Sequence, residues 1–243
     1  MNFNLGEWLG HVKTIAGRYF ILATFSFIIF YVLFPNFFSK IKIQKAFPKN
    51  KDYYRDIIFS IISIAIFASM GYLCFVVCKN SNHIHYGSIK EYGMVYFFLS
   101  FTWLFFLHDA YFYWMHRLMH APLLFKTVHL IHHKSTNPSP WTAYAFHPLE
   151  ALLEAGIIPI AVFTIPLHKI AFGLFMLFQI VYNIYGHLGY EILPRFLLHS
   201  KMGNWLNTSS NHNDHHKYFK GNYGLYTRIW DNLLGTRTHA QRK

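Results

Sequence analysis

Long apolar runs alternate with short polar segments along this chain. Residues 19–38 and 57–78 are almost purely apolar, and residues 92–115 form a third run. Crossing the hydrocarbon core of a bilayer takes about 20 apolar residues, so each run is long enough to span. The pattern predicts three membrane-spanning helices, which follow a short polar and amphipathic lead at residues 1–18.

Residues 149–186 are apolar again, but Pro159 and Pro166 interrupt them. Each half has about 17 residues, fewer than the roughly 20 that a full crossing needs. We therefore predict a helical hairpin that crosses and returns, or a deep re-entrant pair. Either form brings His187 back to the side of the membrane that residues 116–133 face.

Composition and charge agree with a membrane protein. The chain is 53% hydrophobic and 13% charged, whereas an ordinary soluble domain is about 25% charged. The net charge of +12 comes from basic residues that flank the apolar runs, as in cytoplasmic loops, and does not indicate nucleic-acid binding. The basic loop at residues 39–56 predicts the cytoplasmic side. We expect one all-α integral membrane domain over residues 1–243, with about four transmembrane helices or hairpins and a cytosolic, histidine-rich helical cap.

Histidines fall into three short clusters with helical spacing. Residues three and four positions apart share one face of a helix, so each cluster directs two or three imidazoles the same way. Imidazole suits Zn, Cu, Fe and Ni, and three such clusters in one chain predict a metal site. Together with His187 they exceed the needs of one tetrahedral ion, so two metals are expected. The clusters are His116 and His120; His129, His132 and His133; and His212, His215 and His216.

A ligand imidazole usually donates its second ring nitrogen to an acceptor. Asp109 lies near the end of the third span, where an ionisable side chain is a functional candidate, and it can orient such an imidazole. His147 precedes a proline and can be a ligand, can support a ligand or can contact a helix end, and the last two roles are favoured. His83 and His85 follow the second span, across the membrane from the clusters, and are expected to take no part. The carboxylates available as acceptors are Asp109, Asp214, Glu150 and Glu191.

The ligand spacing leaves several functions open. A zinc pair would suit hydrolysis, and an iron pair would suit O2 activation. A metal transporter or sensor would need ionisable residues along several spans, and a bis-haem cytochrome would need histidines at matched depths on facing spans. The boundary of the bilayer, where the clusters lie, favours a lipid substrate.

The clusters and their surroundings resemble the fatty acid hydroxylase/sterol desaturase superfamily. The histidine spacings H-R-x-x-H at 116–120 and H-x-x-H-H at 129–133 and 212–216 carry the resemblance. Further motifs agree with it, and together they cover about residues 100–236. These motifs are YWMHRLMH, HHKS, TAYAFHPLE, GHLGYE and NYGLYTRIWDNLLGT.

The resemblance implies a membrane oxidase that uses O2 and a non-haem pair of irons, which zinc can replace on purification. Asp109 and His147 match motif positions. Asn183 stands where some members carry another histidine, and its amide can hydrogen-bond a ligand or a bound water. The iron ligands implied are His116, His120, His129, His132, His133, His187, His212, His215 and His216.

The implied reaction is the hydroxylation or desaturation of a C–H bond in a sterol-like or fatty-acyl lipid. The chain has no flavin, nicotinamide or haem motif. Electrons would therefore come from an external donor, such as cytochrome b5, a ferredoxin or a reductase. Charge complementarity predicts that the donor docks on the basic cytoplasmic tail. The residues expected there are Lys201, Lys217, Lys220 and Arg228.

Overall fold

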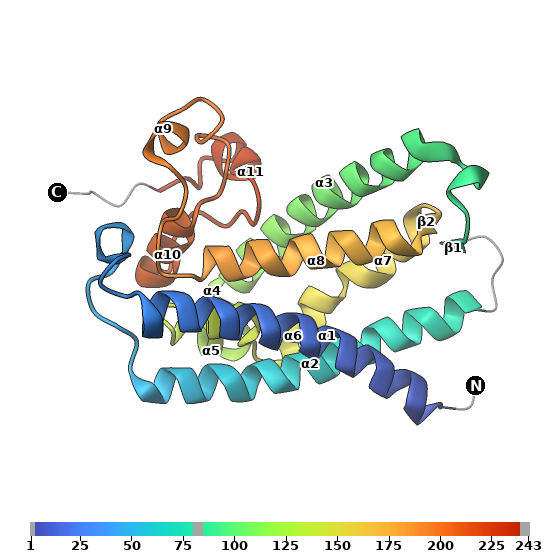
Figure 1. The fold of residues 1–243 in the computed structure, drawn as a ribbon, viewed down its shortest axis with the longest axis horizontal. Helices are drawn as coiled ribbons and strands as arrows, with labels where there is room; N and C mark the ends of the chain where they lie inside the picture. The colour runs from blue at the N-terminus through green and yellow to red at the C-terminus, as the bar shows by residue number, and fades with distance from the viewer. Residues whose placement is uncertain (1–2, 80–84, 239–243) are drawn as a thin grey trace.

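The computed structural model describes residues 3–79 and 85–238, and nearly all of its regular structure is helical (Figure 1). Four helices are long and apolar enough to cross a membrane. They are α1 (Leu5–Phe27) with its π-helical extension η1 (Ile28–Leu33), α2 (Asn50–Lys79), α3 (Gly93–Met119) and α8 (Lys169–Gly186).

The apolar side chains of these helices mostly point outward. In the most apolar stretch of each helix, between 11% and 33% of the residues are buried inside the molecule. Ile21 on α1 is 70% exposed and Val95 on α3 is 74% exposed. Water would not support so large an apolar surface, because each exposed apolar area costs free energy there. The surface fits lipid, and the number of long helices agrees with the predicted membrane fold.

Two helices begin earlier than the sequence pattern predicts. Residues 5–18 of the polar lead belong to α1, because the Asn4 side chain caps this helix by accepting from the Glu7 backbone N–H. Val12, Ile15 and Ala16 then pack on the core, so the helix continues without a break. Likewise α2 begins at Asn50, inside the predicted basic loop, and its first turns carry the buried Asp56. The third helix extends one turn further than predicted and ends just before His120.

The predicted hairpin is present, but its outgoing arm is broken. Two eight-residue helices, α6 (Pro148–Ala155) and α7 (Ile157–Thr164), form that arm, and α8 returns. At the turn, β2 (Leu167–His168) pairs in parallel with β1 (His85–Tyr86), next to the 3₁₀ turn η3 (Ile89–Glu91). Figure 1 shows β1 and β2 at the end of the molecule opposite α10. The main chain of His85 therefore lies far from the histidine clusters, whereas His83 lies outside the described residues.

Short elements build the other end of the molecule. The second histidine cluster follows α4 (Pro122–Leu124) and lies on η4 (Phe125–His129) and α5 (Leu130–His133), ahead of η5 (Pro140–Tyr144). The cap contains α9 (Arg195–Leu198), α10 (Ser209–Tyr218) and α11 (Ile229–Leu233). The segment after α1, with η2 (Ser39–Ile41), joins the cap through a bridge between Lys42 and Tyr190.

Candidate metal centre

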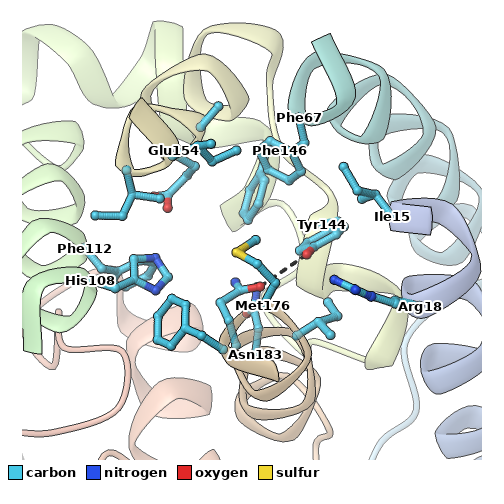
Figure 2. A pocket seen from close by; sticks show the side chains of 16 residues that line it. Ile15, Arg18, Phe67, His108, Phe112, Tyr144, Phe146, Glu154, Met176 and Asn183 are labelled. Atoms are coloured by element: carbon cyan, nitrogen blue, oxygen red, sulfur yellow. Dashed lines mark hydrogen bonds between the residues drawn. The ribbon is translucent and has the colours of Figure 1, made fainter. Parts of the chain in front are cut away.

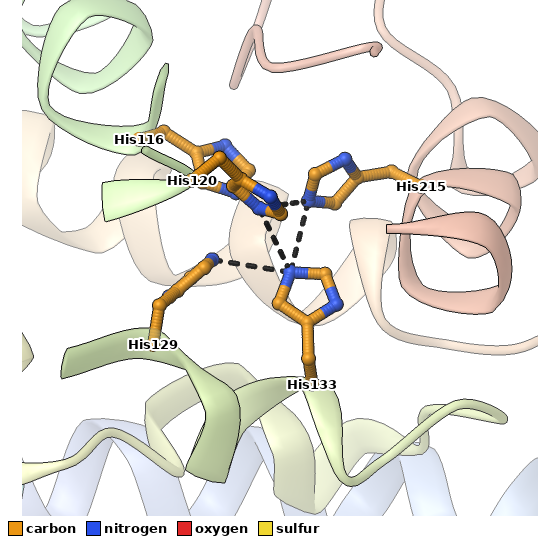
Figure 3. Close-up of side chains that lie close together, drawn as sticks. All are labelled: His116, His120, His129, His133 and His215. Atoms are coloured by element: carbon orange, nitrogen blue, oxygen red, sulfur yellow. Dashed lines mark hydrogen bonds between the residues drawn. The ribbon is translucent and has the colours of Figure 1, made fainter. Parts of the chain in front are cut away.

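The fold gathers all nine predicted ligands into two adjacent groups. Within each group the candidate ligand atoms lie within 4.8 Å of one another. Almost all of these rings are buried, and His120 is the one with intermediate exposure. The first histidine group contains His116, His120, His129, His133 and His215 (Figure 3). The second histidine group contains His132, His187, His212 and His216.

Helix geometry explains how the clusters divide. Residues four apart stay together, as His129 and His133 do in the first group and His212 and His216 do in the second. The remaining ring in each H-x-x-H-H cluster joins the other group, which places His132 in the second group and His215 in the first. Each of these two clusters therefore serves both groups. The pair His116 and His120 comes from the end of α3, and His187 caps the end of α8.

The distances between ring nitrogens match a metal coordination sphere. In the first group, His133 Nε2 lies 3.1 Å from the Nε2 atoms of both His129 and His215. In the second group, His187 Nε2 lies 2.9 Å from His212 Nε2 and 3.1 Å from His216 Nε2. Ligand nitrogens about 2.0–2.1 Å from one metal lie about 2.9 Å apart at right angles and about 3.4 Å apart at the tetrahedral angle.

Hydrogen bonds fix which nitrogen of several rings carries the proton. His187 Nδ1 lies 2.8 Å from the Asn183 carbonyl, and His216 Nδ1 lies 3.0 Å from the Ser135 carbonyl. A carbonyl only accepts, so both Nδ1 atoms carry hydrogen and both Nε2 atoms present lone pairs. These two lone pairs face each other at 3.1 Å. Two acceptors at that distance repel each other unless a cation lies between them, so the second group fits a metal ion.

The first group is oriented in the same way. Glu150 Oε1 lies 2.7 Å from His129 Nδ1, both side chains are buried, and an ionised Glu150 would accept from this nitrogen. The carbonyls of Tyr223 and Gly221 accept from the Nδ1 atoms of His116 and His215, at 2.9 and 2.6 Å. Among the described residues, the buried Nδ1 atoms of His132 and His133 have no partner. Acceptors on Nδ1 hold each ring in the tautomer that a metal ligand needs.

Burial keeps these imidazoles neutral. Desolvation lowers the pKa of His187 to about 4, and it lowers the pKa of His216 well below the usual range. Neighbouring rings lower the pKa of His216 further, because two cations so close would repel. A metal can bind such rings without displacing protons, which removes one cost of binding.

Asp109 does not orient a ligand imidazole. Its buried carboxylate accepts from the backbone N–H groups of Tyr226 and Thr227 at 2.9 and 3.0 Å, and from the Thr227 hydroxyl at 2.6 Å. It therefore ties α3 to the C-terminal segment. Glu150, rather than Asp109, is the carboxyl group that hydrogen-bonds a histidine of the two groups.

The structure also shows the contacts of His147 and Asn183, the other two predicted site residues outside the histidine clusters. The His147 side chain caps α6 by accepting from the Leu149 backbone N–H at 3.3 Å, which makes it a helix-end contact. Neither group contains this residue. The Asn183 amide donates to the Ala143 carbonyl at 2.8 Å, while its backbone carbonyl holds His187.

Three further carboxylates hydrogen-bond the segments that hold the histidines, and the sequence did not predict these contacts. Asp231 accepts from the backbone N–H groups of Tyr223 and Gly224, which positions the carbonyl that holds His116. Glu191 accepts from the Ser210 N–H in the first turn of α10. Asp56 accepts from the Ser135 hydroxyl, next to the carbonyl that holds His216. Asp231 and Glu191 lie in motifs that the sequence makes visible, whereas Asp56 lies in a segment that looks like a basic loop.

A cavity lies directly beside both groups, between α1, α2, α3, α6, α7 and α8 (Figure 2). Its lining is mostly apolar, with Phe67, Phe112, Phe146 and Phe175 among the side chains. The Phe146 ring lies 5.0 Å from the His132 ring, and the Phe112 ring lies 5.0 Å from the His116 ring. Two side chains that line this cavity therefore pack against one ring of each histidine group.

Two adjacent histidine groups on a helical membrane scaffold indicate the class of protein to which this chain belongs. The family model of the fatty acid hydroxylases matches residues 101–236, and the chain belongs to this family. No solved structure matches it.

Relatives with described activities include lathosterol oxidase from Mus musculus, which is 30% identical over 91% of this chain and 71% of its own length. The Rattus norvegicus lathosterol oxidase has the same identity and coverage. A Delta(7)-sterol 5(6)-desaturase from Leptosphaeria maculans is 34% identical over 62% of this chain and 38% of its own length. The family and these relatives support a membrane lipid desaturase or hydroxylase, and therefore an oxidase.

Proposed function

We propose that this protein uses O2 and two histidine-bound irons to hydroxylate or desaturate a C–H bond of a sterol-like lipid. The facing lone pairs of His187 and His216 support the metal assignment, because one cation between them can be bound by both. Nitrogen-only ligand sets suit iron as well as zinc. The names of the relatives, lathosterol oxidase and sterol desaturase, favour iron and an oxidative reaction.

Each histidine group would hold one iron. Two bound irons would supply the reduction of O2 and the oxidation of an unactivated C–H bond. The chain contributes the rest: Glu150 and the backbone carbonyls hold the rings in place, and tight burial excludes water from the site. The roles we propose for the nine histidines are those of ligands, while Asp109 and His147 support the scaffold.

The substrate would enter the cavity beside the two groups. Its apolar lining suits one end of a lipid, because its volume of about 70 Å³ is too small for a whole sterol. The contacts of Phe112 and Phe146 with histidine rings would position one carbon next to the metals. Holding the reacting carbon in one place is a large contribution that a protein scaffold can make to such a reaction. Asn183 lines the same cavity and would limit how closely the lipid approaches His187.

An external protein would supply the electrons from the cytoplasmic side. Lys201, Lys217 and Lys220 are exposed on the cap and offer positive charge to an acidic donor such as cytochrome b5, a ferredoxin or a reductase. Arg228 is excluded from this surface, because it is buried and donates to the carbonyls of Gly203 and Asn204. The basic residues before α2 favour the same cytoplasmic orientation.

The deciding experiment combines metal content with turnover. The protein would be purified without oxygen, loaded with Fe(II), and given a Delta(7)-sterol with an electron donor in air or under argon. We expect two irons per chain, and a sterol product that carries one more oxygen or two fewer hydrogens only in air. His133→Ala and His216→Ala should each lower the iron content and abolish the product.

A matched control removes a histidine outside both groups. His11 lies on α1 and packs against Tyr72 and Phe75, so His11→Gln should keep both irons. Equal product in argon, or full iron content in the His216→Ala protein, would refute the proposal.

A further inference from the structure

A second and larger cavity, the cap cavity, lies between α9, α10 and the segment after α1, and its volume is about 760 Å³. Figure 1 shows α9 and α10 at the same end of the molecule. Two segments that leave membrane-spanning helices meet beside this cavity: the Ile43 N–H donates to the Gly189 carbonyl at 3.0 Å, and the Glu191 N–H donates to the Ile41 carbonyl at 2.8 Å. Because these segments follow the ends of η1 and α8, the cap cavity lies at the level of lipid headgroups.

Cationic side chains dominate the lining of the cap cavity. Two carboxylates also line it, Glu191 and Asp214. The Glu191 carboxylate is already engaged, because it accepts from the Ser210 N–H at 3.0 Å and from the Tyr185 hydroxyl at 2.8 Å. The positive charges outnumber the negative ones, so the cavity attracts an anion. The cations are Lys40, Lys42, Arg195, Lys217, Arg228 and Arg237.

Two of these guanidinium groups lack an anionic partner. Within residues 3–79 and 85–238, neither Arg228 nor Arg237 forms an ion pair with a carboxylate, and their buried Nε atoms have no hydrogen-bond partner. Burial and the nearby charge of Arg237 lower the pKa of Arg228 to about 10. An anion bound next to both would offset their repulsion. Phosphate suits this role, because its several oxygens can accept from cations on more than one side.

Large apolar side chains lie next to the cationic ones. Phe37 precedes Lys40 and is 79% exposed, and Phe196 follows Arg195 and is 78% exposed. Trp205, which follows the lining residue Asn204, is exposed as well. A water-soluble phosphate would account for the cations but would leave these side chains in water. Aromatic side chains beside basic ones are typical of the membrane interface, where the rings meet acyl chains and the charges meet headgroups.

We propose that the cap cavity binds the phosphate headgroup of an anionic phospholipid. Lys40, Arg195 and Arg237 hold the phosphate oxygens, and the acyl chains remain in the bilayer beside Phe37 and Phe196. None of the nine histidines lines this cavity, so the bound lipid is a partner of the protein and not its substrate. It joins the segment after α1, α9 and the residues after α11 at the membrane surface.

Equilibrium lipid binding to the detergent-purified protein tests this proposal. Radiolabelled dioleoylphosphatidylglycerol, which is anionic, would be compared in mixed micelles with dioleoylphosphatidylcholine, which has the same chains and a phosphate but no net charge. One basic residue changes the affinity for an anionic lipid about 5-fold. Wild type should therefore bind phosphatidylglycerol more tightly, and Lys40→Gln and Arg195→Gln should each lower that affinity about 5-fold. Both residues are exposed, so the variants should fold, and phosphatidylcholine affinity should be unchanged.

Lys45→Gln is the matched control for Lys40→Gln. Lys45 belongs to the same segment and is exposed, but it does not line the cap cavity. This variant should bind phosphatidylglycerol as wild type does. An equal loss in Lys45→Gln would indicate attraction to surface charge in general and would overturn the proposal, as would equal binding of the two phospholipids by wild type.

Two further measurements separate the lipid from other anions. sn-Glycerol 3-phosphate carries the phosphate without acyl chains, and even a roughly 100-fold excess should not displace phosphatidylglycerol, because it lacks the apolar contacts. Displacement would show a site for soluble phosphates instead. Weaker binding of cytochrome b5 by the Arg195→Gln protein, with phosphatidylglycerol affinity unchanged, would assign the cap cavity to the electron donor. Neither iron nor turnover enters the lipid measurements, so their failure is distinct from failure of lipid oxidation.

Discussion

Replacing Glu150 with glutamine should weaken iron binding in one histidine group and spare the other. Glu150 Oε1 lies 2.7 Å from His129 Nδ1, and the two side chains are 0% and 2% exposed. A carboxylate on the second nitrogen makes the imidazole a stronger ligand, and water cannot replace it at this depth. Loss of such a partner costs about 10- to 100-fold in metal affinity, or ~1.4–2.8 kcal/mol.

The assay is competition for Fe(II) with a chelator, followed by the iron-to-protein ratio. Wild type should release its irons at similar chelator concentrations, whereas the Glu150→Gln protein should release about one iron at 10- to 100-fold lower chelator. Glu154→Gln is the matched control, since Glu154 lies one turn further along α6 and forms no hydrogen bond with a histidine among the described residues. Wild-type release by the Glu150→Gln protein, or equal loss of both irons, would refute the reasoning.

Three further predictions follow from buried and surface charges. Burial lowers the pKa of His187 to about 4, against an ordinary value of about 6.5 in the unfolded chain. The unfolded chain therefore binds the proton more readily, and the metal-free protein should lose stability as the pH falls from about 6.5 toward 4. Melting temperatures that do not change between pH 7 and pH 5 would contradict this. Asp109→Asn weakens three hydrogen bonds between α3 and the C-terminal segment and should lower the free energy of unfolding by about 1–3 kcal/mol, seen as a lower melting temperature and faster proteolysis of the cap; wild-type values for both would count against it. Lys217→Glu with Lys220→Glu should slow turnover driven by a protein donor but leave iron content and turnover driven by a chemical reductant unchanged, and unaltered donor-driven turnover would rule out docking at this face.

Local periodicity was sufficient for much of the metal centre. The sequence alone predicted the nine histidines that converge, because residues four apart on a helix must share a face wherever that helix packs. It also predicted the helical membrane architecture and the return of His187 to the same end, since both depend on the lengths of apolar runs. Asn4 and the early start of α1 were missed, because a capping side chain acts within one turn and does not change hydropathy.

Tertiary packing decided how the histidines divide and what holds them. His132 lies in the second group and His215 in the first because of how α5 and α10 face each other. The spacing of residues within one helix does not specify this. Glu150, rather than Asp109, supports an imidazole because α6 packs against the second cluster, while α3 turns Asp109 toward the C-terminal segment. Lys40 and Arg195 likewise line one cavity because a bridge joins Lys42 to Tyr190, in two segments far apart in the chain. The sequence determines which face of each helix carries chemistry, and only long-range packing determines which faces meet.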